Sequence, residues 1–454
     1  MELQALLEDL ARLEGGAFSD RLLQARLAAQ PEWTAVERAR HTALWRLTLE
    51  NAPRHEALLA PRLRRRPRPL LRAALRLGLT LLEDGHAPHA VLSELLEAMG
   101  DRSPQERSLV NGVLRTWLRE APPLAVKAPL SATPPVAAGA STPTATAASA
   151  SGEDFPPWFR ELIRGLDGDA ALEPAALAGL RYQLFRERGT WLRVNLSRWT
   201  PAEALQELTS LGLEPATAPE CPRYLRLRRM PEDGLHALVP LTDGRLNVQD
   251  LSVWGALSLL DPPRGCRVLD LCAAPGGKAL ALLEADPTLR LTMVESDPGR
   301  ARALERRLDG RGRLRVADGR SFGEVDWPRI LLDAPCSGSG SVGHRPEILQ
   351  KREPLSPRLL DLQAGLLAHA ADLLAPGGRL VYSTCSLDPR ENALQVQALL
   401  ATRDDLKPLP ALVPEGCRDE AGGWSWVPWR RRDPRLPSRP GAGGAWALAL
   451  EKRT

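Results

Sequence analysis

The chain has 454 residues, of which 43% are hydrophobic and 26% charged, and its formal net charge is +4. This composition is typical of a globular protein of about three domains and excludes fibrous or wholly disordered chains. No stretch approaches the ~18 uninterrupted apolar residues of a membrane span, and the first residues, MELQALLEDLARLE, are amphipathic and acidic, unlike a signal peptide. We therefore expect a cytoplasmic protein with no membrane partner.

The amino-terminal part, residues 1–121, has apolar side chains at helical spacing, as in PLLRAALRLGLTLLEDG (69–85). We predict an all-α domain. Within it, RLRRRPRPLLRAALR (62–76) concentrates arginines that could pair with nucleic-acid phosphates. The alternative is a solvated helix face in a composition that prefers arginine to lysine, and the segment alone favours neither.

Residues 122–154 are rich in Pro, Ala, Ser and Thr and lack large apolar side chains, which predicts a linker. Residues 155–250 mix helical runs such as PAEALQELTSLG (201–212) with strand-like runs such as TWLRVNLS (190–197). We predict a small α+β subdomain there.

Residues 251–454 alternate strand-like and helical runs, which predicts an α/β, Rossmann-like domain with a mostly parallel sheet. The strand-like runs are CRVLDL (266–271), RLTMVES (290–296), RLRVA (313–317), RILLDA (329–334) and GRLVYSTCS (378–386). Ligands of such sheets bind beyond the carboxyl ends of the strands. Four of these ends carry an acidic residue, namely Asp270, Glu295, Asp318 and Asp333.

The loop after the first of these strands, LDLCAAPGGK (269–278), is similar to a phosphate-binding loop but departs from it twice. Cys272 stands where the first Gly is needed, and Ala279 where a hydroxyl should follow Lys278. The dinucleotide spacing G-x-G-x-x-G is absent as well. Because Glu295 ends the second strand and could accept hydrogen bonds from ribose hydroxyls, we predict a nucleoside cofactor without phosphates, S-adenosylmethionine. Asp297 is instead expected to cap the following helix.

Cysteines follow two further strands. The six cysteines of the chain form no C-x-x-C pair, so neither zinc nor a disulfide framework is expected. Cys336 and Cys385 should both face the cofactor crevice, where a thiolate is a strong nucleophile. Methylation at carbon 5 of a pyrimidine needs a nucleophile at carbon 6 and an acid at the ring nitrogen, a role open to Asp333. The alternative is a pair of buried structural thiols.

Three motifs together resemble the RNA cytosine-5 methyltransferases of the Sun/Fmu (RsmB-like) family: VLDLCAAPGGK, LLDAPCSGSG and LVYSTCSLDPREN. The resemblance extends upstream through LNVQDLSVWGALSLLDP, and PLLRAALRLGLTLLEDGHAPHAVLSELL is similar to the helical NusB-like RNA-binding domain of the bacterial 16S rRNA enzymes. It implies a NusB-like domain at 1–121, a small RNA-binding subdomain at 155–250 and a catalytic domain at 251–454.

The resemblance also implies residue roles. Cys385 would be the nucleophile, and Cys336 would assist release of the product. The implied cofactor contacts are Cys272, Ala273, Ala274, Pro275, Gly276, Gly277, Lys278, Glu295, Asp318 and Asp333. The expected partner is RNA, above all 16S rRNA, and we expect a monomer without a metal.

Two segments depart from the family pattern. Gly343-His344-Arg345-Pro346-Glu347 replaces the usual two arginines before His-Pro-Asp, and Gly443-Gly444-Ala445-Trp446 replaces Asp-Gly-Phe-Phe in an expected closing hairpin. We expect His344 to be solvated. Two alternative functions stay open: a tRNA cytosine-C5 methyltransferase, and a non-catalytic RNA-binding or antitermination-type protein.

Overall fold

The computed structural model describes residues 2–14, 19–100, 103–120, 154–185, 189–218, 221–229, 231, 235, 238–351, 353–410, 423–427 and 442–454. The chain forms two compact units, which are Met1–Arg181 with Arg345–Arg352, and Tyr182–His344 with Glu353–Thr454. The predicted linker, up to residue 153, lies outside the described residues. The division into parts at 1–121, 155–250 and 251–454 therefore stays a proposal.

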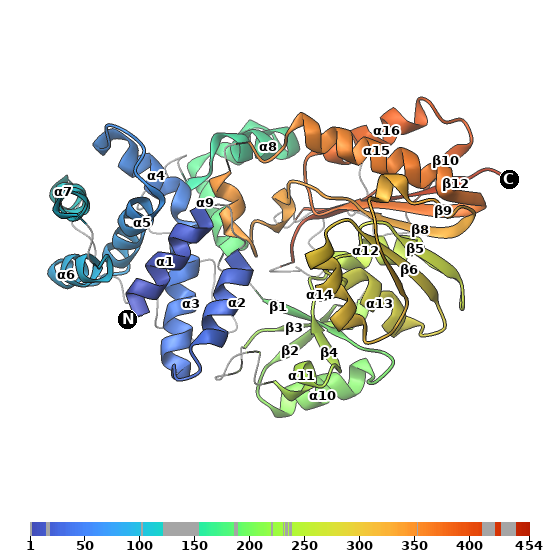
Figure 1. Ribbon diagram of the computed structural model, residues 1–454, viewed down its shortest axis with the longest axis horizontal. Helices are drawn as coiled ribbons and strands as arrows, with labels where there is room; N and C mark the ends of the chain where they lie inside the picture. Colours follow the sequence, from blue (N-terminus) through green and yellow to red (C-terminus); the bar gives the residue numbers. More distant parts are fainter. Residues whose placement is uncertain are drawn as a thin grey trace. The chain divides into compact units, whose positions relative to one another are not determined.

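The first unit is helical in its described residues, as predicted for its amino-terminal part (Figure 1). Its helices are α1 (Glu2–Glu14), α2 (Ser19–Ala29), α3 (Ala35–Glu50), α4 (Ala52–Leu59), η1 (Ala60–Arg62), α5 (Pro69–Glu83), α6 (Pro88–Ala98), α7 (Pro104–Glu120), α8 (Pro157–Asp167), η3 (Asp169–Leu172), most of α9 (Pro174–Phe185) and η7 (Pro346–Gln350). Among the helices of the described residues, none combines the length and apolar character that crossing a membrane would need.

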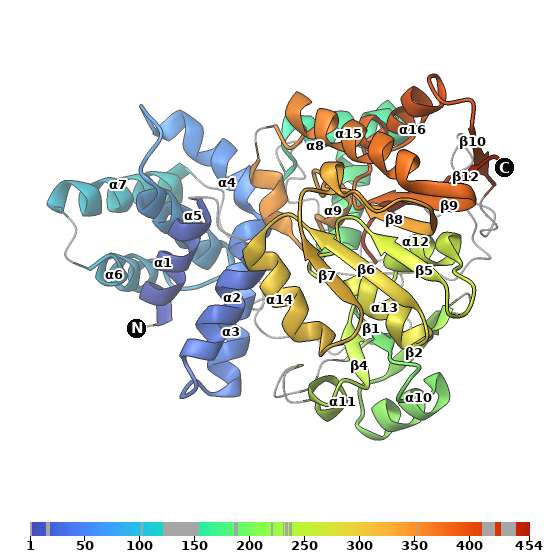
Figure 2. The same cartoon turned by 45° about the vertical axis from the view of Figure 1, so that its right-hand side comes forward.

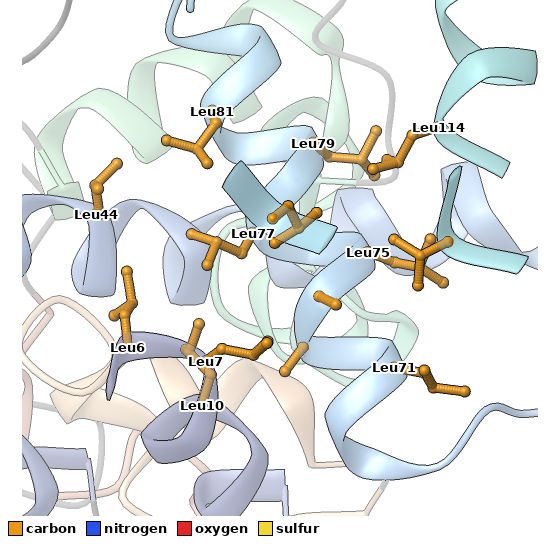
Figure 3. Close-up of a cluster of buried hydrophobic side chains, with 14 of the residues drawn as sticks. Leu6, Leu7, Leu10, Leu44, Leu71, Leu75, Leu77, Leu79, Leu81 and Leu114 are labelled. Carbon is orange, nitrogen blue, oxygen red and sulfur yellow. The ribbon is translucent and has the colours of Figure 1, made fainter. Parts of the chain in front are cut away.

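Helix α5 is the centre of this unit, because every residue from Leu71 to Leu82 is buried. Its leucines pack against those of α1, α3 and α7, as Figure 3 shows for Leu77 and Leu79. A Cβ atom at Gly78 would lie only 2.6 Å from a methyl carbon of Leu114 on α7. The glycine therefore allows α5 and α7 to pack closely.

The arginines of segment 62–76 differ in their burial. In the part of the segment that belongs to α5 they neither face solvent nor lie open to a phosphate. Arg72 and Arg76 are buried, and their Nε atoms donate to the same carboxylate oxygen of Glu56 at 2.8 and 2.9 Å. Buried charges require such partners, so these two arginines belong to the core of the unit. Arg64, Arg65 and Arg66 before α5 are exposed and remain available to a phosphate.

The first unit also contains a segment from late in the chain, residues 345–352. Ile348 and Leu349 of η7 are buried, and η7 contacts α3 and α4. Arg76 donates to the side chain of Gln350 at 2.8 Å, and the Trp158 indole donates to the Lys351 carbonyl at 2.8 Å. The helical unit is therefore discontinuous in sequence.

The second unit begins with a small antiparallel sheet in the strand order β2-β3-β1-β4. Its strands are β1 (Thr190–Val194), β2 (Pro215–Ala218), β3 (Cys221–Leu227) and β4 (Leu246–Val248), accompanied by α10 (Pro201–Ser210) and α11 (Val239–Thr242). Helix α10 starts at a capping box in which Thr200 and Glu203 satisfy each other's backbone N–H groups. The predicted α+β character of this region is confirmed.

The larger sheet has the strand order β10-β12-β9-β8-β5-β6-β7, with β11 paired to β12. Strands β5 to β9 are parallel, and β12 is antiparallel to β9, β10 and β11. The strands are β5 (Arg267–Asp270), β6 (Arg290–Glu295), β7 (Arg313–Val316), β8 (Trp327–Asp333), β9 (Leu374–Thr384), β10 (Leu406–Leu409), β11 (Trp424–Trp426) and β12 (Ala445–Lys452). The predicted α/β domain is confirmed. Strands β11 and β12 are antiparallel, but the residues between them lie outside those that the structure describes, so the expected closing hairpin stays a prediction.

Helices cover both faces of this sheet (Figure 2). Because side chains alternate along a strand, Val268 lies in one core and its neighbour Leu269 in the other. The helices are α12 (Val253–Leu260), α13 (Gly277–Ala285) and α14 (Pro298–Leu308) on the first face, and α15 (Pro357–Leu373) and α16 (Ala393–Leu400) on the second. This burial on both faces leaves the strand ends as the accessible edge.

Candidate active site

The acidic side chains predicted at strand ends lie along one edge of the parallel sheet. Asp270 ends β5, Glu295 ends β6 and Asp333 ends β8. In the register, Asp270 pairs with Met293 of β6 and with Leu331 of β8. The structure thus brings these carboxylates to a common edge, where parallel sheets bind ligands.

The loop 272–278 turns sharply between β5 and α13. Gly276 has a φ of 94°, in the left-handed region, and a Cβ atom there would lie 2.3 Å from a methyl carbon of Leu304. Glycine is required for both reasons. Arg300 donates to the Ala274 carbonyl at 2.6 Å and Arg307 to the Pro275 carbonyl at 2.5 Å, so α14 holds the loop.

Glu295 lies against this loop and is buried. Its two carboxylate oxygens accept hydrogen bonds from the backbone N–H groups of Ala274, at 3.3 Å, and Asp297, at 2.9 Å. A carboxylate has about four acceptor positions, so capacity remains for the hydroxyls of a ribose. Asp297 caps α14 by accepting from the Arg300 N–H at 2.6 Å, as predicted.

Asp318 occupies the turn after β7 and is the most exposed of the four predicted acids. It caps η5 (Gly319–Ser321) and pairs with Arg320 at 2.6 Å, and the hydrogen bonds from Arg320 lower its pKa to about 2. The carboxylate is therefore ionised at neutral pH but already engaged with a neighbouring arginine.

Lys278 and Asp333 form an ion pair of 2.6 Å. Ser383 at the end of β9 donates to the other oxygen of Asp333 at 2.9 Å. Burial favours the neutral amine, but the charge of Asp333 holds the pKa of Lys278 above its ordinary value. The sequence assigned Lys278 to the cofactor loop, and the structure additionally joins it to the predicted acid.

The two predicted thiols lie side by side, with 3.0 Å between the Sγ atoms of Cys336 and Cys385. The hydrogen bond with Cys336 lowers the pKa of Cys385 to about 7, with a further contribution from the charge of Lys278. The same hydrogen bond, burial and the charge of Cys385 raise the pKa of Cys336 well above its ordinary value. The direction of the two shifts favours Cys385 over Cys336 as the nucleophile of the pair.

Two other cysteines have a raised pKa. Burial and the charge of Asp270 raise the pKa of Cys272, and burial raises that of Cys266. Cys221 is buried, and Cys417 lies outside the described residues. Within the described part of the chain, no group of His, Cys, Asp and Glu side chains is arranged to hold a metal ion.

Two interactions in the second unit were not predicted from the sequence. His344 is exposed, as expected, but it also pairs with the Asp250 carboxylate at 2.7 Å, and that carboxylate accepts from the Gly443 N–H at 2.8 Å. Asp250 thereby links the two segments that depart from the family pattern. Glu391, within the DPREN run, is fully buried and accepts hydrogen bonds from both cysteine loops. No local pattern in the sequence indicates the burial of Glu391 or the pairing of His344 with Asp250.

Comparison with known proteins identifies the family. The protein-family model with the description "16S rRNA methyltransferase RsmB/F" matches residues 257–428 of the sequence. Ribosomal RNA small subunit methyltransferase B of Xylella fastidiosa (strain 9a5c) is 34% identical over 92% of this chain and 92% of its own length. The chain belongs to the RsmB/F family of 16S rRNA methyltransferases. The protein of the same name from Klebsiella pneumoniae (strain 342) is 34% identical over 70% of each chain.

The remaining comparisons agree with this membership. The NusB family model matches residues 3–119, within the helical unit. The crystal structure of PH0851 covers 99% of this chain with a TM-score of 0.76 at 22% identity, and that of NSun6 from Pyrococcus horikoshii with SFG covers 66% with a TM-score of 0.55 at 19% identity. These two likenesses concern the fold. As an RsmB/F member, the protein is an S-adenosylmethionine-dependent RNA methyltransferase, not a non-catalytic RNA-binding module.

Proposed function

We propose that this protein methylates carbon 5 of a cytosine in 16S rRNA through a covalent bond between Cys385 and carbon 6. The observation that carries the proposal is the close pair of thiols with unequal pKa values, beside the Lys278–Asp333 ion pair. The names of the relatives support ribosomal RNA as the substrate. A cytoplasmic location and a monomeric state are part of the same proposal.

The cofactor would be held by the loop 272–278 together with Glu295, Asp318 and Asp333. The carboxylates can accept hydrogen bonds from the ribose and amino groups of this cofactor. The loop lacks the sequence of a phosphate-binding loop, as expected for a nucleoside sulfonium, which has no phosphate. S-adenosylmethionine supplies an electrophilic methyl group. Glu295 would accept from the ribose hydroxyls, and Gly276 and Gly277 let the backbone approach the ligand.

Chemistry would begin at Cys385. Its thiolate adds to carbon 6 of the cytosine while Asp333 donates a proton to the ring nitrogen, and the resulting enamine carbon 5 takes the methyl group. Asp333 is a carboxylate in its ion pair with Lys278, so the proton comes from the Lys278 ammonium at 2.6 Å, passes through Asp333 to the ring nitrogen and leaves Lys278 as the neutral amine. The carbon 5 proton is then removed, the bond between sulfur and carbon 6 breaks, and the ring nitrogen loses its proton.

Cys336 would assist that elimination. Its pKa is raised by the hydrogen bond with Cys385 and by the negative charge of Cys385. The charge effect disappears once Cys385 has become a thioether, so the Cys336 thiol loses its proton to solvent more easily and its thiolate can then serve as the base. The assignment of Cys385 as nucleophile and Cys336 as the group that assists release is the one that the family resemblance implies, and the direction of the two pKa shifts agrees with it.

The target cytosine must leave its stack, because a paired base hides carbon 6 from an attacking thiol. Unpaired loop nucleotides are therefore the favoured targets. Exposed arginines such as Arg64, Arg65 and Arg66 would contribute phosphate contacts, with affinity that falls as salt rises.

Labelled cofactor with naked 16S rRNA or tRNA, followed by mapping of 5-methylcytosine, tests the function. We expect wild-type protein to label 16S rRNA. Labelling of tRNA alone would replace the substrate, and the absence of 5-methylcytosine in any RNA would overturn the proposal.

The two cysteines are tested by substitution. We expect Cys385→Ala to abolish methyl transfer, because no nucleophile remains for carbon 6. Cys336→Ala should accumulate a covalent protein–RNA adduct, visible as a shifted band on a denaturing gel, because elimination fails. Cys266→Ala, a change at a thiol remote from the pair, is the control and should match the wild type. An adduct that forms only when Cys385 is removed would reverse the two roles.

A further inference from the structure

One buried carboxylate, that of Glu391, joins the turns that follow the two thiols. Its Oε1 accepts from the backbone N–H of Ser337 at 2.8 Å and from the side-chain amide of Gln363 at 3.0 Å. Its Oε2 accepts from the hydroxyls of Ser337, at 2.5 Å, and Ser386. Ser337 directly follows Cys336, and Ser386 directly follows Cys385.

The network also holds the residues around these turns. The Gln363 amide donates to the carbonyl of Pro335 at 2.8 Å, so Cys336 is held on both sides. The Tyr382 hydroxyl of β9 donates to the Glu391 carbonyl at 2.6 Å, which holds η8 (Pro389–Glu391) against the strand that leads to Cys385. Glu391 therefore lies at the centre of a connection between β9, α15 and both cysteine loops.

A carboxylate with no solvent exposure is costly unless hydrogen bonds satisfy its oxygens. Here four donors from three residues converge on Glu391, and two of these residues are the immediate neighbours of the thiols. We propose that Glu391 is the positioning residue that fixes the separation and orientation of Cys336 and Cys385. The inference rests on the proposed function, in which both thiols act on one base.

Glu391 also acts electrostatically on the pair. The pKa of Cys336 is raised mainly by its hydrogen bond with Cys385 and by burial, and the negative charge of Glu391 raises it further. A neutral side chain at this position should therefore reduce the difference in reactivity between the two thiols. The effects of geometry and charge can be separated by substitution. Glutamine keeps the shape of the side chain but removes its charge, whereas alanine removes both.

The experiment compares Glu391→Ala, Glu391→Gln and the double variant Ser337→Ala/Ser386→Ala in the full chain. Misplacing reacting groups by about 1 Å costs ~100-fold in rate, so we expect Glu391→Ala to lower kcat by about that factor. KM for RNA should stay close to that of the wild type. Glu391→Gln should restore most of the lost rate, because the serine hydroxyls can rotate to accept from its amide. The double variant should lose rate although Glu391 remains.

Alkylation by iodoacetamide, resolved by site with mass spectrometry across pH, is the second readout and needs no RNA. The wild type should be modified at Cys385 first, and Glu391→Gln should narrow the preference over Cys336. Arg390→Ala, at an exposed neighbour that pairs with Asp388, is the matched control and should keep both rate and preference. If no variant of the protein methylated RNA, the proposed function would fail while the alkylation result still tested Glu391.

Two outcomes would overturn the inference. The first is a Glu391→Ala protein with the kcat and alkylation pattern of Arg390→Ala. The second is that kcat falls in proportion to thermal stability in every variant while all of them keep the wild-type alkylation preference for Cys385. Glu391 would then stabilise only the fold.

Discussion

Asp270 ends β5 with its carboxyl group buried, and burial together with the charge of Asp333 raises its pKa to about 7. A folded state that holds this proton more tightly than the unfolded state loses stability as pH rises from about 4 to about 7. Asp270→Asn removes that dependence. At 1.36 kcal/mol per pKa unit, we expect the variant to be more stable than the wild type near pH 8 by up to about 4 kcal/mol. The two proteins should be alike near pH 4.

Urea unfolding at several pH values measures this difference. Asp261→Asn is the matched control, because the Asp261 side chain is 80% exposed and its removal should leave the pH dependence intact. A stability difference between Asp270→Asn and the wild type that is the same at every pH would contradict the expected buried, protonated carboxyl group.

Single residues of the site differ in how far the sequence reveals them. Asp333, Cys336 and Cys385 could be placed at strand ends, since apolar runs locate the strands and the sheet edge follows. Glu391 could not, because an acidic residue in a polar turn is ordinarily solvated and only the three-dimensional fold buries it. The pairing of His344 with Asp250 depends likewise on residues far apart in the chain.

At the scale of elements, a buried ion pair connects β1 with α13. Arg193 of β1 lies 2.7 Å from Glu284 of α13 and donates to the Gly277 carbonyl at 3.1 Å. Removing one partner leaves the other charge buried without compensation, so we expect Glu284→Ala to lower the free energy of unfolding by about 3–5 kcal/mol. Because Gly277 belongs to the cofactor loop, affinity for S-adenosylmethionine should fall as well, as measured by calorimetry.

Glu207→Ala is the matched control, because Glu207 of α10 pairs with Arg245 at 3.0 Å near the protein surface. Surface pairs contribute about 0–1 kcal/mol, so this variant should unfold close to the wild type. Equal effects of the two substitutions would contradict the importance of burial at Glu284.

Most elements could be predicted because their patterns are local. Strands of a parallel sheet covered on both faces are continuous apolar runs, such as RILLDA, and α5 has helical spacing throughout. The burial of Arg72 and Arg76 was not predictable, since arginine alone says nothing of a partner such as Glu56. The place of η7 depends on contacts with helices about 300 residues earlier, which no local pattern records.

At the scale of the whole molecule, η7 should be needed for the stability of the helical unit. Ile348 and Leu349 are almost fully buried. Truncating a buried large aliphatic side chain to alanine costs about 2–5 kcal/mol, so we expect Ile348→Ala/Leu349→Ala to increase hydrogen exchange in α3 and α4. Amides of β5 and β8 should keep their protection. Val325→Ala, at an exposed position, is the control, and unchanged exchange in α3 and α4 would contradict the prediction.

The discontinuity of the helical unit has a consequence for biosynthesis. A ribosome adds about 5–20 residues per second, so α3 and α4 leave it many seconds before η7 has been made. During that interval the apolar surface that Ile348 and Leu349 later cover is open to solvent and to chaperones. The unit that starts the chain is therefore completed only after the segment carrying Cys336 has been translated.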